Sequence, residues 1–83
     1  MANRGDYAIR IVDEYGNPRR GKKVHLTFWG TFGGTWEDGF TDGDGWAHFV
    51  NCPCHIQYVT VDGDTIVDDD FMMEDGGTRS FSV

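Results

Sequence analysis

Three stretches decide the fold of this 83-residue chain: IVDEYGNP at residues 11–18, GKKVHLTF at residues 21–28 and TDGDGWAHF at residues 41–49. In the second stretch, apolar side chains recur at every other position from Val24 to Phe28, which places them on one face of an extended strand. Glycine, proline and Asp-Gly pairs lie between the runs and are typical of tight turns. The pattern predicts a strand, a turn, a second strand, and then a turn into a further strand.

Alternating runs bounded by turn residues continue to the end of the chain. They predict about seven strands and no helix. A glycine-rich turn that contains Phe32 is expected over residues 30–34, and the Asp62-Gly63 pair predicts a tight hairpin, since this dipeptide tolerates positive φ. The runs that can form strands are residues 7–12, 23–29, 35–41, 46–50, 55–61, 64–67, 71–73 and 78–83.

Short turns between consecutive strands favour antiparallel pairing, and a single sheet would leave one apolar face in water. We therefore expect an all-β fold, a small immunoglobulin-like antiparallel β-sandwich. The length leaves room for one core, so residues 1–83 are expected to form a single domain. The predicted core consists of Ile9, Ile11, Val24, Leu26, Phe28, Phe49, Ile56, Tyr58, Val61, Phe81 and Val83.

The third stretch has the form Thr-Asp-x-x-Gly-x-x-x-Phe, with Thr41, Asp42, Gly45 and Phe49 at the four defined positions. Together with the strand–turn–strand before it, this run resembles the carboxypeptidase-regulatory-like and transthyretin-like group of small immunoglobulin-type β-sandwiches. The resemblance implies a structural turn into a core strand and an accessory module. The transthyretin-like hydrolases of oxidised urate end in a tyrosine-arginine-glycine-serine type of tail. This chain ends in RSFSV at residues 79–83, and the departure removes the one catalytic interpretation that the resemblance offers.

Charge is distributed unevenly along the sequence. The formal net charge is -7; residues 1–23 hold six of the seven basic side chains, whereas residues 37–75 hold eleven acids and no Lys or Arg. One interpretation is a solvated acidic surface that keeps a small protein soluble. The other is a basic end that meets the acidic end of another copy. The excess of acids disfavours binding to the phosphates of nucleic acids. A small acidic inhibitor that imitates nucleic acid through residues 62–75 is an alternative.

Metal and cofactor sites are not expected. An EF-hand loop begun at Asp42 would place Trp46 and Pro53 at positions that need oxygen ligands, so this segment is expected to be an Asx-type turn. Cys52 and Cys54 form a single CxC pair, which is weak evidence for a zinc site that requires four converging ligands. Two residues apart in an extended chain, the thiols point the same way, so free thiols are expected.

An enzyme would need a nucleophile with its base, or a pair of carboxylates held in a cleft. The sequence indicates neither. Cys54 and His55 are neighbours, but adjacent residues of a strand face opposite sides. We therefore expect a protein that is not an enzyme.

Aromatic residues gather between residues 28 and 49, and the alternation of a strand turns Trp29 away from Phe28. An exposed tryptophan can stack on a sugar ring, anchor a protein interface, or cover the edge of a strand. The sequence leaves these three roles open for Trp29, Trp36 and Trp46.

These observations favour a non-catalytic structural or assembly module that acts through protein–protein contacts, with itself or with a larger particle. Carbohydrate binding through the tryptophans is the first alternative and nucleic-acid mimicry the second. Residues 78–83 are expected to form an open sheet edge, and opposite charges are expected to steer head-to-tail contacts. The interaction residues so predicted are Arg19, Arg20, Lys22, Lys23, Trp29, Trp36, Trp46, Asp68, Asp69 and Asp70.

No membrane partner is expected, because the chain lacks the long apolar stretch of a spanning helix. The first six residues also lack the apolar core of a secretory signal. The chain as given therefore predicts synthesis in the cytosol, with association with a virion or a cell surface left open.

The Asp62-Gly63 turn gives a first testable prediction. In a two-residue hairpin of this type position 63 has positive φ, where a β-branched residue is strained. Gly63→Val is expected to lower the free energy of unfolding by about 1–3 kcal/mol, measured by urea denaturation. An unchanged unfolding midpoint would show that position 63 does not need positive φ.

Overall fold

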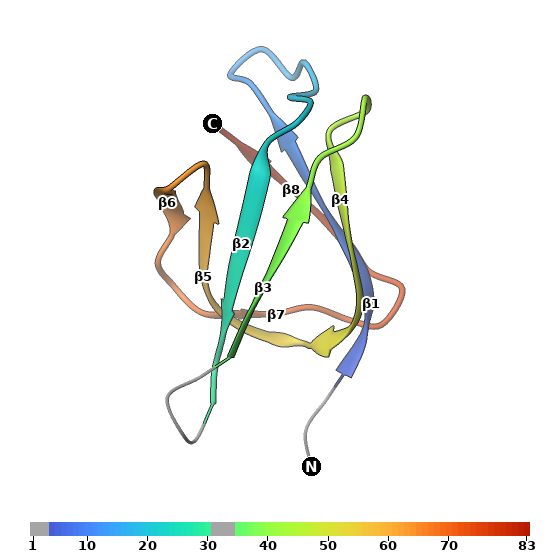
Figure 1. The fold of residues 1–83 in the computed structure, drawn as a ribbon, viewed down its shortest axis with the longest axis vertical. Helices are drawn as coiled ribbons and strands as arrows, with labels where there is room; N and C mark the ends of the chain where they lie inside the picture. Colours follow the sequence, from blue (N-terminus) through green and yellow to red (C-terminus); the bar gives the residue numbers. More distant parts are fainter. Residues whose placement is uncertain (1–3, 31–34) are drawn as a thin grey trace.

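The computed structural model describes residues 4–30 and 35–83, which form eight strands in two facing sheets (Figure 1). The three-stranded sheet has the order β4-β1-β8, with β1 (Arg4–Val12), β4 (Trp46–Pro53) and β8 (Thr78–Ser82). The five-stranded sheet has the order β3-β2-β5-β6, and β7 pairs with the start of β5. Its strands are β2 (Lys23–Phe28), β3 (Thr35–Phe40), β5 (His55–Val61), β6 (Asp64–Val67) and β7 (Phe71–Met72). The all-β sandwich expected from the sequence is confirmed, and the described residues contain no helix.

The eight strands correspond to the eight runs expected from the sequence, the shortest being β7, with two residues. One detail of the expected architecture is wrong. The pairing is not antiparallel throughout, because β8 runs parallel to β1 and pairs Ala8 with Thr78 and Val12 with Ser82. A parallel neighbour requires the chain to cross over before it returns, and here the crossover is the excursion through the five-stranded sheet. The turn expected over residues 30–34 lies, apart from residue 30, outside the described residues.

The core lies between the two sheets, and its centre is the alternating pattern recognised in the sequence. Val24 and Leu26 are fully buried, and Phe28 is 2% exposed. Eight of the eleven predicted core residues are buried, and Phe81 is half-buried against them. Buried residues that the prediction omitted are Tyr7, Ala8, Ala47, Cys52, Cys54, Val59 and Met73.

Tyr58 and Val83 were wrongly assigned to the core; they are 40% and 45% exposed. The error at Tyr58 comes from a β-bulge. Thr27 pairs with Tyr58 while the next residue of β2, Phe28, pairs with Ile56, so β5 has one extra residue at this point. A bulge shifts the alternation of inward and outward side chains by one position. Val83 lies just beyond the end of β8, where the five-stranded sheet does not cover it.

Two turns have the same construction: the turn at Asp13 follows β1, and the turn at Asp42 precedes β4. The Asp42 carboxylate accepts the backbone N–H groups of Asp44 and Trp46 at 2.9 and 3.0 Å, which confirms the expected Asx-type turn. The Asp13 carboxylate accepts two backbone N–H groups in the same way, both at 2.9 Å. These bonds hold the pKa of each carboxyl below its usual range. At a pH above the usual pKa of a carboxyl group, these bonds therefore stabilise each turn. This stabilisation is lost as the pH falls through the lowered pKa.

The turn at Asp42 packs against β1. The N–H of Ile11 donates to the carbonyl of Gly45 at 2.8 Å. Gly45 has φ +84°, and a Cβ atom there would lie 2.6 Å from the carbonyl oxygen of Ile11. Only glycine satisfies both the backbone conformation and this close approach.

Thr41 joins two of the connections between the sheets, the loop from β1 to β2 and the loop from β3 to β4. It is the one buried polar residue among those described, at 5% exposure. Its hydroxyl donates to the carbonyl of Arg19 at 2.6 Å and accepts the N–H of Lys22 at 2.8 Å. Its own N–H donates to the carbonyl of Lys22, and its carbonyl accepts the N–H of Gly21, both at 3.0 Å. The loop from β1 to β2 is thus joined to the loop from β3 to β4.

The Asp62-Gly63 hairpin expected from the sequence is confirmed. The two residues have φ values of 49° and 89°, the left-handed pair that a type I′ turn requires. Gly43 lies in a turn, lacks positive φ and has nothing within 4 Å of an added Cβ. Gly43→Val is therefore the matched control for Gly63→Val.

Thr41→Val is expected to destabilise the protein by about 1–3 kcal/mol, because the substitution keeps the shape but leaves the carbonyl of Arg19 and the N–H of Lys22 without the hydroxyl. The free energy of unfolding is measured by urea denaturation. Thr60→Val, at a half-buried position of β5, is the control and is expected to change stability by less than about 0.5 kcal/mol. Equal effects of the two substitutions would contradict the role assigned to Thr41.

Candidate interaction surfaces

Two of the four basic residues predicted to form one pole of the molecule lie beside acidic residues of the chain. The ammonium group of Lys22 lies 3.1 Å from the Asp62 carboxylate, and that of Lys23 lies 3.7 Å from the Asp38 carboxylate. The pKa of the Asp62 carboxyl is lowered, mainly by the hydrogen bond from the backbone N–H of Lys23 and to a smaller extent by the side chain of Lys22. Arg19 and Arg20 are exposed on the loop from β1 to β2. Two of the four predicted basic side chains thus form ion pairs within the chain.

The acidic residues predicted for the other pole lie on the exposed loop between β6 and β7. Asp68 and Asp69 are exposed. Asp70 differs, because its carboxylate Oδ2 lies 2.7 Å from Nε2 of His55 on β5. The sequence did not indicate this bond, which joins residues from separate strands and loops.

The three tryptophans lie on two different faces. Trp46 pairs with Arg10 on the outer side of the three-stranded sheet, where it is half-buried and the Arg10 guanidinium lies 5.7 Å from the centre of its ring. Trp29 and Trp36 lie on the outer side of the five-stranded sheet, at 52% and 63% exposure. The turning of Trp29 away from the buried Phe28, expected from the alternation, is confirmed.

Each exposed tryptophan of the five-stranded sheet is stacked on a histidine. The rings of Trp36 and His25 have centroids 5.4 Å apart and planes 28° apart. Nδ1 of His25 lies 2.6 Å from the Asp38 carboxylate. The three side chains come from β2 and β3, which pair in a register that places His25 opposite Asp38.

The second group repeats this arrangement at the far end of β2. The rings of Trp29 and His55 have centroids 5.7 Å apart and planes 28° apart, and His55 is bonded to Asp70 as described above. The N–H of Trp29 donates to the carbonyl of His55 at 3.0 Å, so the two residues face each other across β2 and β5. We call these two sets the Trp-His-Asp groups.

Tyr58 and Phe40 add two more exposed aromatic side chains to this face; Phe40 pairs with Lys23, on the outward side of β2. Trp36 pairs with Thr27, which in turn pairs with Tyr58, so the three residues form a row across β3, β2 and β5. Tyr58 joins the face only because the bulge in β5 turns it outward. Tyr58, His25 and His55 were not among the interaction residues predicted from the sequence, although strand alternation places His25 outside, since it shares the parity of Trp29.

The open edge expected at the C-terminal strand is present, because no described strand pairs with the far side of β8. The N–H of Ala8 donates to the carbonyl of Gly77 at 3.2 Å, and the N–H of Val83 donates to the carbonyl of Val12 at 2.9 Å. In a parallel ladder only alternate residues of a strand bond to a given neighbour. The backbone N–H and C=O groups of Thr78, Ser80 and Ser82 therefore point away from β1.

A hollow of about 260 Å³ lies between the edges of the two sheets on this side. Ile66 and Val83 contribute its apolar wall, and charged side chains lie at its rim. The aromatic residues that close the core nearby are tilted against each other: the ring centroids of Phe71 and Phe81 are 5.8 Å apart, and the guanidinium of Arg79 lies 4.5 Å from the centre of the Phe71 ring. The sandwich is thus less completely closed here than on the opposite side, where β3 meets β4.

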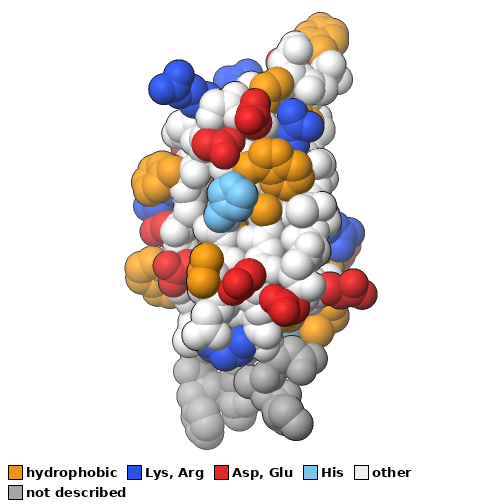
Figure 2. All heavy atoms as spheres, turned by 90° about the vertical axis from the view of Figure 1, so that its right-hand side faces the viewer, with side chains coloured by type: hydrophobic (Ala, Val, Ile, Leu, Met, Phe, Trp, Pro, Cys, Tyr) orange, Lys and Arg blue, Asp and Glu red, His pale blue; other side chains and the backbone are white. Residues whose placement is uncertain are grey.

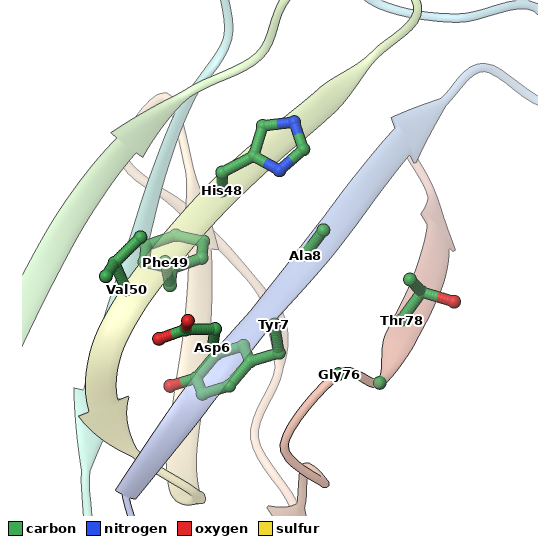
Figure 3. Close-up of a pocket in the computed structure, with 9 residues that line it drawn as sticks. Asp6, Tyr7, Ala8, His48, Phe49, Val50, Gly76 and Thr78 are labelled. Atoms are coloured by element: carbon green, nitrogen blue, oxygen red, sulfur yellow. The ribbon is translucent and has the colours of Figure 1, made fainter.

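A shallow groove of about 310 Å³ runs over the three-stranded sheet (Figure 3). Ala8 lies between His48 on β4 and Thr78 on β8, so the small side chain leaves the groove open. Figure 2 shows the side of the molecule on which β1 and β4 lie, with hydrophobic side chains spread among acidic and basic ones.

The part of the chain that the structure describes contains no cluster of three or more His, Cys, Asp or Glu side chains that could hold a metal ion. It also contains no helix long and apolar enough to cross a membrane. Both cysteines are free and buried, and burial raises the pKa of each thiol. Burial likewise raises the pKa of Tyr7, whose hydroxyl donates to the carbonyl of Pro53 at 2.6 Å.

No protein-family model, no curated protein sequence and no solved structure matches this chain. The resemblance to the carboxypeptidase-regulatory-like and transthyretin-like group therefore stays a prediction. The surfaces described above carry the functional argument.

Cys52 and Cys54 are expected to react slowly with iodoacetamide in the folded protein at pH 8, because burial limits access and the raised pKa leaves less thiolate than in a free cysteine. In urea both should react at the rate of an unstructured peptide. A chelator is expected to leave the unfolding midpoint unchanged. Fast labelling of the folded protein, or a large loss of stability with chelator, would contradict these expectations.

Proposed function

We propose that this domain is a non-catalytic module that acts through protein–protein contact, in which a second copy of the chain adds its own β8 to the free edge of β8. The observation that carries the proposal is that edge. Its outward backbone groups belong to Thr78, Ser80 and Ser82, and they form a row of donors and acceptors available to another strand.

The edge lacks the features that usually block such pairing. Natural edge strands are protected by charged side chains, prolines or bulges. The one charged residue of β8 is Arg79, and its guanidinium stacks on the rings of Phe71 and Phe81. It therefore covers the end of the core and leaves the edge unguarded.

The edge at β3 is a weaker candidate. That strand carries Glu37 and Asp38 and is paired with β2 on one side, and it approaches β4 of the other sheet. Charges of one sign placed opposite each other across two copies would repel. Edge pairing between copies is therefore favoured at β8 over β3.

The hollow beside Ile66 and Val83 supplies a place for side chains of the added strand. Apolar side chains buried there would add hydrophobic stabilisation to the backbone bonds, and the acidic and basic residues at its rim would remain in water. Two antiparallel β8 strands related by a two-fold axis bury the same surface on both copies, which gives a closed dimer.

The test uses Ser80→Pro, with Ser80→Ala as its control. Proline removes the outward N–H of residue 80 and is tolerated where that group faces solvent, so each chain should fold as before. Because the contact is two-fold, each substitution acts twice, and Ser80→Pro is expected to weaken dimerisation by about tenfold or more. Sedimentation equilibrium measures the dissociation constant, and circular dichroism checks the fold.

Ser80→Ala retains the backbone N–H and is expected to dimerise like the unsubstituted protein. A monomer at every concentration of the unsubstituted protein would overturn the proposal. Equal dimerisation of the proline and alanine variants would also overturn it, since pairing would then not use this edge.

A further inference from the structure

Edge pairing at β8 does not account for the exposed aromatic residues on the outer face of the five-stranded sheet. Trp29 and Trp36 expose more than half of their surface, although tryptophan is normally well buried. Tyr58 is exposed beside them. None of these three residues belongs to the core or lines the hollow at β8.

The two indole rings are held in place. Each one stacks on an imidazole, and each imidazole is bonded to a carboxylate at 2.6 or 2.7 Å. A side chain that is already ordered loses little conformational entropy when a ligand binds. The Trp-His-Asp groups thus present fixed aromatic surfaces at small entropic cost.

The same groups provide hydrogen bonds next to the aromatic surfaces. The carboxylates of Asp38 and Asp70 accept hydrogen bonds, and the imidazoles of His25 and His55 donate or accept according to their tautomer. Thr27 adds a hydroxyl between Trp36 and Tyr58. Aromatic surface flanked by donors and acceptors suits a ligand that has both apolar C–H faces and many hydroxyl groups, as a pyranose ring does.

The geometry favours a flat, extended ligand. Trp36 and Tyr58 are separated by two strand spacings, about 10 Å, and Trp29 follows two residues after Thr27 on the same side of β2. The aromatic residues therefore extend over three strands of an open sheet face. An extended chain of β-linked pyranoses can cover them together.

Charge selects against acidic glycans. The chain has a formal net charge of -7, and the two carboxylates lie beside the tryptophans. The nearby Lys23 is already 3.7 Å from the Asp38 carboxylate. An anionic polysaccharide would be repelled from this face, whereas a neutral one would not.

We propose that the outer face of the five-stranded sheet binds a neutral, β-linked glycan, with Trp29 and Trp36 stacking on its sugar rings and the two His-Asp pairs bonding to its hydroxyl groups. Binding of this kind is independent of the pairing at β8, which uses a different sheet. The side chains that carry the site are Trp29, Trp36, His25, His55, Asp38 and Asp70.

The first experiment titrates the full chain carrying Trp46→Phe, so that the fluorescence comes from Trp29 and Trp36 alone, since the chain has three tryptophans. The probes are cellohexaose and xylohexaose, which are neutral and β-linked, with the α-linked maltohexaose and the anionic polygalacturonate for comparison. A saturable change of emission with a β-linked probe, and a weaker response to the other two, is expected. No saturable response to either β-linked probe, or stronger binding of polygalacturonate, would overturn the proposal.

The second experiment measures affinity by calorimetry for Trp36→Ala and Trp29→Ala. Loss of one stacking contact is expected to weaken binding by about three- to tenfold. Trp46→Ala, on the other sheet, is the matched control and should bind like the unsubstituted protein. Both exposed substitutions should leave the circular dichroism spectrum unchanged; unchanged affinity in the Trp29→Ala/Trp36→Ala double variant would overturn the assignment of the site.

Ser80→Pro separates the two proposals. It should bind glycan with the same affinity as the unsubstituted chain while its dimerisation is weakened. A loss of glycan binding in this variant would contradict the independence of the two surfaces.

Discussion

The fold depends on the hydrogen bonds through which Thr41 joins two of the connections between the sheets, the loop from β1 to β2 and the loop from β3 to β4. A sandwich of this size has few side chains with which to fix the angle between its layers, and here the backbone groups of the two connecting loops do so. The hydroxyl of Thr41 donates a hydrogen bond to the carbonyl of Arg19 and accepts one from the N–H of Lys22. The carbonyl of Gly45 accepts the N–H of Ile11 and so holds the adjacent turn against β1. Because these contacts set where β4 pairs with β1, the alignment of the core residues on the two sheets follows from them.

The bulge in β5 links the core to the exposed aromatic face. Without the extra residue, Ile56 and Val59 would lie on opposite sides of the sheet, and one of them would face water. The bulge allows both to be fully buried and turns Tyr58 outward beside Thr27. A single local irregularity thus completes the hydrophobic core and widens the surface that we assign to glycan binding.

The two sides of the sandwich differ in how far they are closed, and this difference separates the proposed functions. Where β3 approaches β4, the sheets meet and the edge carries acids. Between β6 and β8 the core is covered by half-buried residues such as Ile66 and Phe81. Protein contact at the open side leaves the outer face of the five-stranded sheet free. Lys22 and Lys23 form ion pairs with acids of the same chain, so neither proposal relies on opposite poles of charge.

The sequence by itself determined the all-β class, most of the core, the Asx-type turn at Asp42 and the hairpin at Gly63, because each depends on residues close together in the chain. It also placed Trp29 outside through strand alternation. The tertiary structure decided the rest. The parallel pairing of β8, the bulge at Tyr58 and the partners of His25 and His55 are set by the register between distant strands. Alternation has a period of two only while that register is unbroken, so no pattern within one strand could show which side chains meet across the sheet.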